Sequence, residues 1–151
     1  MPERGRFTAQ MDGTYDGPEG DERQVPSFYR EFATGHHKPM VLSETSALYN
    51  NSRKAGASNQ AIKSAWMDQV LTPSVVTRYP ELKMINWFEQ LKSEQEHYGV
   101  VDWRATADPQ ALQALKAHLA SGRYLFAPAH YDPMCSRPST VGVRSTQVDD
   151  P

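Results

Sequence analysis

The sequence has one cysteine, no long apolar run and no excess of basic charge. The single cysteine, Cys135, excludes an internal disulfide, and a lone thiol is compatible with either redox compartment. No apolar stretch approaches the roughly 20 residues needed to cross a bilayer, so we expect no membrane partner. The formal net charge of -2 leaves no basic footprint and argues against nucleic acid as a partner.

The histidines form no metal-binding pattern. His36 and His37 are adjacent, so on an extended segment their side chains would point to opposite sides. His130 lies near Cys135 but is not accompanied by a second spaced pair of ligands. We therefore expect neither a metal nor a cofactor.

The length of 151 residues favours one domain and is well short of the ~250 residues typical of an eight-stranded α/β barrel. Glycines and a proline among acidic residues predict an N-terminal loop over residues 1–20. Periodic apolar patterns predict a folded domain over residues 21–122. From residue 123 onward the periodicity is lost and prolines are frequent, so residues 123–151 are predicted to be a disordered tail.

Three helices and two strands are predicted within residues 21–122. The first helix is predicted by an apolar stripe at i, i+3, i+4 and i+7, formed by Val25, Phe28, Tyr29 and Phe32. Gly35 is expected to end this helix in a left-handed conformation. The run MVLS at 40–43 reads as a strand buried on both faces, and residues 45–57 as an exposed loop. Ser58 is expected to cap a second helix that Pro73 ends. A second strand follows at 82–88, and Asp108 caps a third helix that ends at Gly122.

Strands separated by helices predict a parallel α/β sheet. Two strands cannot form such a sheet alone, because each face and each edge needs cover. The sequence therefore reads as part of a larger fold.

An ordered series of motifs resembles the C-terminal part of fungal glycoside hydrolase family 26 proteins, which include endo-β-1,4-mannanases. No single motif is diagnostic, and the likeness covers roughly residues 15–119. The motifs are KPMVLSETS at 38–46, IKSAW at 62–66 with Gln69 and Val70, YPELK at 79–83, NWF at 86–88 and DWR at 102–104.

The resemblance implies the C-terminal portion, about two strands and three helices, of a TIM-type (β/α)8 barrel that is incomplete on its own. Residues 40–43 would match the seventh barrel strand and residues 82–88 the eighth. The catalytic nucleophile of the family maps onto Glu44, and its aromatic platform beside the sugar maps onto Trp87. Nothing matches strands one to six, so the family's acid/base glutamate is missing. The family is typically secreted, although the first ten residues lack the apolar core of a signal peptide.

The chemistry suits Glu44, because a retaining glycosidase needs a rigidly held carboxylate and strand ends provide one. Without the resemblance, an exposed surface glutamate would be the ordinary interpretation. Trp87 could stack on a sugar or belong to the core, and Tyr49 could line a sugar site or anchor a loop. Trp66, on a helix stripe, favours the core, and the DWR motif favours a structural corner with an ion pair.

Three hypotheses follow from these patterns. The first is a retaining glycosidase lineage acting on a mannan-like β-linked polysaccharide, with the isolated chain inactive because the acid/base carboxylate is missing. The second is a non-catalytic sugar-binding or interaction remnant, or a truncated gene product. The third is an unrelated small α/β binding domain, which requires two strands and three helices to close a core by themselves.

Overall fold

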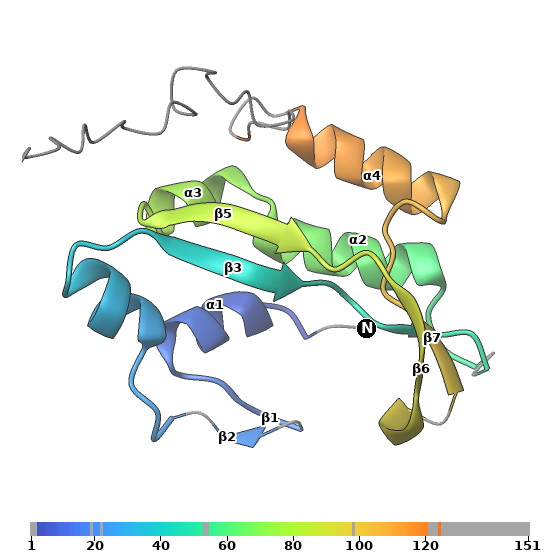
Figure 1. Cartoon of the computed structure of the whole chain (residues 1–151), viewed down its shortest axis with the longest axis horizontal. Coiled ribbons are helices and arrows are strands. Elements are labelled where there is room, and N and C mark those ends of the chain that lie inside the picture. The colour runs from blue at the N-terminus through green and yellow to red at the C-terminus, as the bar shows by residue number, and fades with distance from the viewer. Residues whose placement is uncertain are drawn as a thin grey trace, which may run out of the picture.

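The computed structural model describes residues 3–18, 20–21, 23–52, 55–97, 99–120 and 124 (Figure 1). The elements are, in chain order, α1 (Arg6–Asp12), β1 (Asp16–Gly17), β2 (Gly20–Asp21), the π-helical segment η1 (Tyr29–Thr34), β3 (Met40–Thr45), β4 (Tyr49–Asn50), α2 (Asn59–Val70), α3 (Pro73–Arg78), β5 (Leu82–Trp87), β6 (Leu91–Glu94), a short 3-10 turn (Gln95–His97), β7 (Gly99–Asp102) and α4 (Pro109–Leu119). Among these residues no helix is both long and apolar enough to span a bilayer.

The parallel pair β3–β5 is the centre of the fold. The two strands are joined by a crossover that contains α2 and α3, as the strand–helix–strand order predicts. Within the described part of the chain each strand has one neighbour, so each has one edge without a partner strand. The expected parallel pairing is confirmed.

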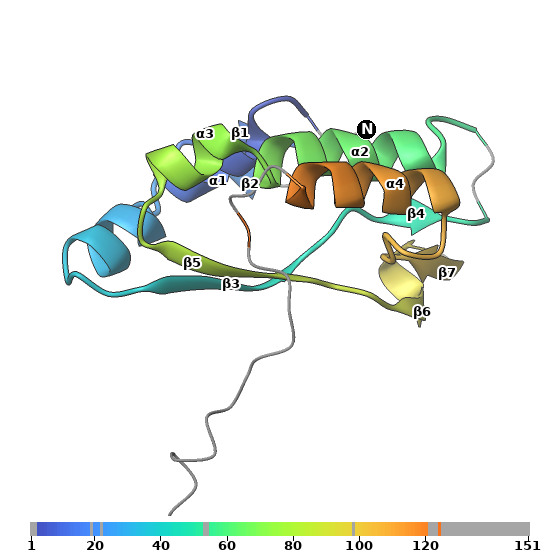
Figure 2. The ribbon, with the colours of Figure 1, turned by 90° about the horizontal axis from the view of Figure 1, so that it is seen from above.

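Figure 2 shows α1, α2, α3 and α4 on the same side of the β3–β5 pair. The hydrophobic core lies between the helices and the strands. Phe7 of α1 contacts Trp66 and Tyr79 edge-to-face, with ring centroids 6.1 and 6.2 Å apart. Met67 and Val70 of α2 are fully buried in the same cluster. One face of the strand pair is therefore covered.

The other face of the strand pair is open, in contrast to the prediction of a strand buried on both sides. Val41 of β3 is 45% exposed, and its register partner Met84 of β5 is 47% exposed. A parallel sheet normally has layers on both faces, whereas the described elements cover only one face of the β3–β5 pair.

A second, antiparallel sheet has the order β4–β7–β6. Tyr49 pairs with Asp102 and Asn50 with Val101, while Leu91 pairs with Asp102 on the other side of β7. The expected exposed loop at 45–57 is thus wrong in part, because β4 and the buried Ala47 lie within it. The pairing depends on residues about fifty positions away, which a local pattern does not reveal.

The predicted loop over residues 1–20 contains helix α1, which buries Phe7 and Met11. That prediction is wrong because the two apolar residues, four positions apart, form a contact face too short to stand out from flanking glycines. Tyr124, in the expected tail, contacts the core cluster. The remaining expected tail residues, 123 and 125–151, lie outside the described residues, as does Gly122.

The helix expected before β3 differs from its prediction. It is π-helical, and within it only Tyr29 and Ala33 are buried, whereas Phe28 and Phe32 are more than half exposed. Gly35 has a right-handed φ of -62°, and the left-handed residue is His37 with φ 53°. Gly35 is required for another reason, because a Cβ there would lie 2.6 Å from the Glu31 carbonyl oxygen.

Candidate functional site

Glu44 lies at the C-terminal end of β3, beside an irregularity in the strand register. Leu42 pairs with Ile85 and Thr45 pairs with Trp87, so β3 has one more residue than β5 between these pairs. Such bulges re-aim side chains at functional sites. The Glu44 side chain is exposed and lines a pocket.

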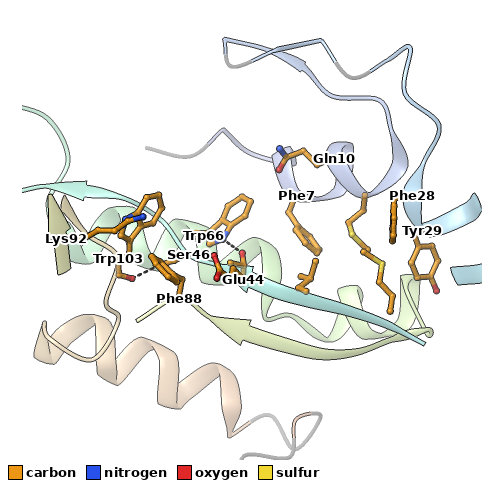
Figure 3. A pocket seen from close by; sticks show the side chains of 14 residues that line it. Phe7, Gln10, Phe28, Tyr29, Glu44, Ser46, Trp66, Phe88, Lys92 and Trp103 are labelled. Carbon is orange, nitrogen blue, oxygen red and sulfur yellow. Dashed lines mark hydrogen bonds between the residues drawn. The ribbon is translucent and has the colours of Figure 1, made fainter. Parts of the chain in front are cut away.

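The pocket has a volume of about 480 Å³ and runs along β3. Figure 3 shows Glu44 near its middle, with Phe88, Trp103 and Lys92 toward one end and Phe28 and Tyr29 toward the other. Its lining is largely aromatic and apolar, with a few polar groups, as in ligand sites of known proteins. Among the described residues the Glu44 carboxylate has no hydrogen-bond or ion-pair partner. It is therefore available to a ligand.

Three side-chain hydrogen bonds hold the chain immediately after Glu44. The Trp66 indole donates to Thr45 Oγ1 at 2.9 Å. The Ser46 hydroxyl donates to the backbone oxygen of Trp103. The Lys63 ammonium group donates to the backbone oxygen of Ala47. These bonds come from α2 and from the segment after β7, so they fix the strand end to two separate elements.

Lys63 is fully buried, which is rare for a lysine. Its Nζ also donates to the backbone oxygen of Asp102 at 2.6 Å and thereby joins the ends of β3 and β7. Burial lowers the pKa of Lys63 to about 8, although the carboxylates of Asp102 and Glu89 act in the opposite direction. No signal in the local sequence pattern indicates its burial.

The DWR motif forms the structural corner that the sequence predicts. Burial acts to raise the pKa of Asp102, but hydrogen bonds from Arg104 outweigh it and leave that pKa below its usual range. The guanidinium Nε of Arg104 lies 3.0 Å from Asp102 Oδ1. Glu89 accepts hydrogen bonds from the backbone N–H groups of Ala105 and Thr106. These hydrogen bonds restrain the corner that carries Trp103.

Trp103 lines the pocket, although the sequence did not predict it as a site residue. Its indole N–H donates to Glu94 Oε1 at 2.9 Å, and Lys92 Nζ lies 2.8 Å from the same oxygen. Burial acts to raise the pKa of Glu94, but hydrogen bonds from Lys92 and Trp103 outweigh it and lower the pKa. Phe88 packs edge-to-face on Trp103, with ring centroids 5.9 Å apart.

The structure places Glu44 in the pocket but brings neither Trp87 nor Tyr49 to it. Trp87 packs against the core cluster, and its indole N–H donates to the Trp103 backbone oxygen at 3.2 Å. Tyr49 lines a separate cavity of about 240 Å³ with Ile62 and His97. Trp66 is buried, as predicted, and also lines the Glu44 pocket.

In the described part of the chain no group of three or more His, Cys, Asp or Glu side chains is arranged to hold a metal ion. No protein-family model, curated protein or solved structure matches the chain.

Proposed function

We propose that this chain is the C-terminal portion of a retaining β-glycosidase barrel that acts on a mannan-like polysaccharide, with Glu44 at the nucleophile position. One observation carries the proposal. Glu44 is a carboxylate without a partner in the described structure, at the C-terminal end of a parallel strand, in an aromatic-lined pocket. Catalytic groups of α/β barrels gather at that end of the strands.

The nucleophile of a retaining glycosidase attacks the anomeric carbon and must be ionised and rigidly aimed. The bonds at Thr45, Ser46 and Ala47 restrain the backbone next to Glu44. The open face and the unpaired edges of the β3–β5 pair are consistent with further strands completing the sheet. Those strands would supply the second carboxyl group.

The isolated chain is proposed to be inactive. Protonation of the leaving group contributes about 10²–10⁴-fold to such reactions, and substrate positioning would be lost as well. The two predicted substrate-binding residues, Trp87 and Tyr49, do not line the pocket, although the Trp87 indole donates a hydrogen bond to the backbone oxygen of the pocket residue Trp103.

The test is complementation. A chimera joins the first six strand–helix units of a family 26 mannanase to residues 3–120 of this chain, which include α1 and its pocket residues Phe7 and Met11. We expect the chimera to hydrolyse mannan and Glu44→Gln to abolish that activity, because the substitution removes the nucleophile. The unmodified 151-residue chain should show no hydrolysis.

Glu81→Gln in the chimera is the matched control, since Glu81 immediately precedes β5, at the opposite end of the strand pair from Glu44. Equal activity in the Glu44→Gln and Glu81→Gln chimeras would overturn the nucleophile assignment. Turnover by the isolated chain that Glu44→Ala abolishes would overturn the claim that a second carboxyl group must come from elsewhere.

The non-catalytic alternative, a sugar-binding remnant, is supported by the same aromatic lining. It predicts saccharide binding together with an inactive chimera.

A further inference from the structure

We propose that the pocket beside Glu44 selects a neutral over an anionic saccharide and that Trp103, with Phe88, is the apolar wall on which a sugar ring stacks. The inference rests on the proposed function for the choice of a saccharide as ligand. It assigns the stacking surface to residues outside the motif position that the family resemblance indicates.

Trp103 has the fixed orientation that a stacking surface needs. Its indole N–H is bonded to Glu94, which is itself buried. Its backbone oxygen accepts from Ser46 and from Trp87. The side chain is only partly buried and lines the pocket. The hydrogen bond to Glu94 therefore fixes the ring while part of the ring stays accessible to a ligand. A preorganised ring binds a ligand without the cost of ordering its own side chain.

Phe88 completes the wall. Its ring lies at 71° to the Trp103 ring, so the two rings form an apolar corner rather than a flat stack. A pyranose ring has an apolar C–H face and a polar rim of hydroxyl groups. The corner fits the apolar face, while Glu44 and Gln10 of the same pocket offer hydrogen-bonding groups to the rim.

The charges around the corner disfavour an anionic ligand. The Lys92 ammonium lies 5.2 Å from the centroid of Phe88, and Glu94 offsets its charge at 2.8 Å. An anionic sugar would meet Glu44, whose charge no described residue offsets. A neutral saccharide avoids this repulsion.

The experiment measures binding of β-1,4-mannohexaose to the full chain by NMR titration and calorimetry. Hexagalacturonate serves as the anionic comparison. We expect binding of the neutral oligosaccharide and a loss of about tenfold or more in affinity for Trp103→Ala, which corresponds to about 1.4 kcal/mol. Intermolecular NOEs should connect the Trp103 indole protons to C–H protons of the sugar.

Phe32→Ala is the matched control, because Phe32 is an exposed aromatic residue that does not line this pocket. It should leave the affinity unchanged. If Trp103→Ala does not fold, Phe88→Ala and the NOEs in the unmodified chain decide the question. Phe88→Ala should also lower the affinity, because it removes one side of the corner.

Unchanged affinity in Trp103→Ala, NOEs from another aromatic ring alone, or tighter binding of the anionic hexamer would each overturn the inference. Absence of any oligosaccharide binding would overturn it as well. None of these results decides the nucleophile assignment, which depends on the chimera and its Glu44 variant. The two proposals can therefore fail separately.

Discussion

At the scale of single residues, Lys63 links the candidate site to the rest of the fold. It is a buried ammonium group that bonds two backbone oxygens, one in the segment after Glu44 and one at the end of β7. Its pKa of about 8 is below the value of about 10.4 usual for lysine, because burial disfavours the charged form. Folding at neutral pH therefore buries a charge at a cost.

This cost predicts a pH dependence of stability. Between about pH 8 and pH 10 the unfolded chain binds more protons at Lys63 than the folded chain, so the free energy of unfolding should rise with pH across this window. The rise should not exceed about 3 kcal/mol, at about 1.4 kcal/mol per pKa unit. Urea denaturation followed by circular dichroism at several pH values measures it.

Lys63→Met is the informative variant for this prediction. It removes the titrating group and leaves the backbone oxygens of Ala47 and Asp102 without their donor. The variant should show no rise in stability between about pH 8 and pH 10. A rise of the same size in the variant would assign the effect to other groups and contradict the role given to Lys63.

At the scale of elements, the sequence predicted the features that depend on neighbouring residues and missed those that depend on residues far apart in the chain. Ser58 and Asp108 cap α2 and α4 as predicted, because a cap involves only neighbouring residues. The short strands β4, β6 and β7 were not predicted. The pairing of β4 with β7 joins residues about fifty positions apart, which a local pattern does not reveal.

A register irregularity breaks the regular alternation of side chains along β5. Alternation predicts Lys83, Ile85 and Trp87 on one face. A shift in register between Met40 and Val41 moves Leu82 to the core side along with Ile85 and Trp87, and leaves Lys83 exposed. Glu44 could be singled out from its place at a strand end, whereas Trp103 joins the pocket only through the fold of β7.

Helix α1 offers a test of element stability with a matched pair of glycines. Gly5 and Gly13, at its two ends, both have positive φ, 76° and 67°. A Cβ on Gly13 would lie 2.8 Å from the backbone N of Ser27 and the backbone O of Val25, whereas a Cβ on Gly5 would meet nothing within 4 Å.

We expect Gly5→Ala to lower the free energy of unfolding by about 1 kcal/mol, the cost of a left-handed residue alone. Gly13→Ala should cost at least twice as much, roughly 2 kcal/mol or more, because strain and a backbone clash add. Thermal or urea unfolding of both variants measures the difference. Equal losses would show that α1 does not dock against the 25–27 segment as described.

At the scale of the whole molecule, the uncovered side of the strand pair is the dominant feature. Val41 and Met84 lie on it, and Phe28 and Phe32 add exposed aromatic surface near the start of β3. Open strand edges and exposed apolar surface promote association between molecules. The chain should therefore self-associate as its concentration rises.

Sedimentation velocity over a range of concentrations tests this expectation. The double variant Val41→Lys with Met84→Lys should reduce association, because it places like charges on the open face. Val100→Lys changes an exposed valine of the other sheet and should have little effect. A monodisperse monomer with a sharp cooperative melt would contradict the interpretation of an incomplete fold.

The most direct measurement of the central claim uses the chimera and a 2-deoxy-2-fluoro-β-mannosyl fluoride, which traps the covalent intermediate of a retaining glycosidase. Peptide mass spectrometry then locates the trapped sugar. The account predicts one fluoromannosyl group on the peptide that contains Glu44, and none after Glu44→Gln. A label on a different carboxylate of this chain, in an active chimera, would contradict it.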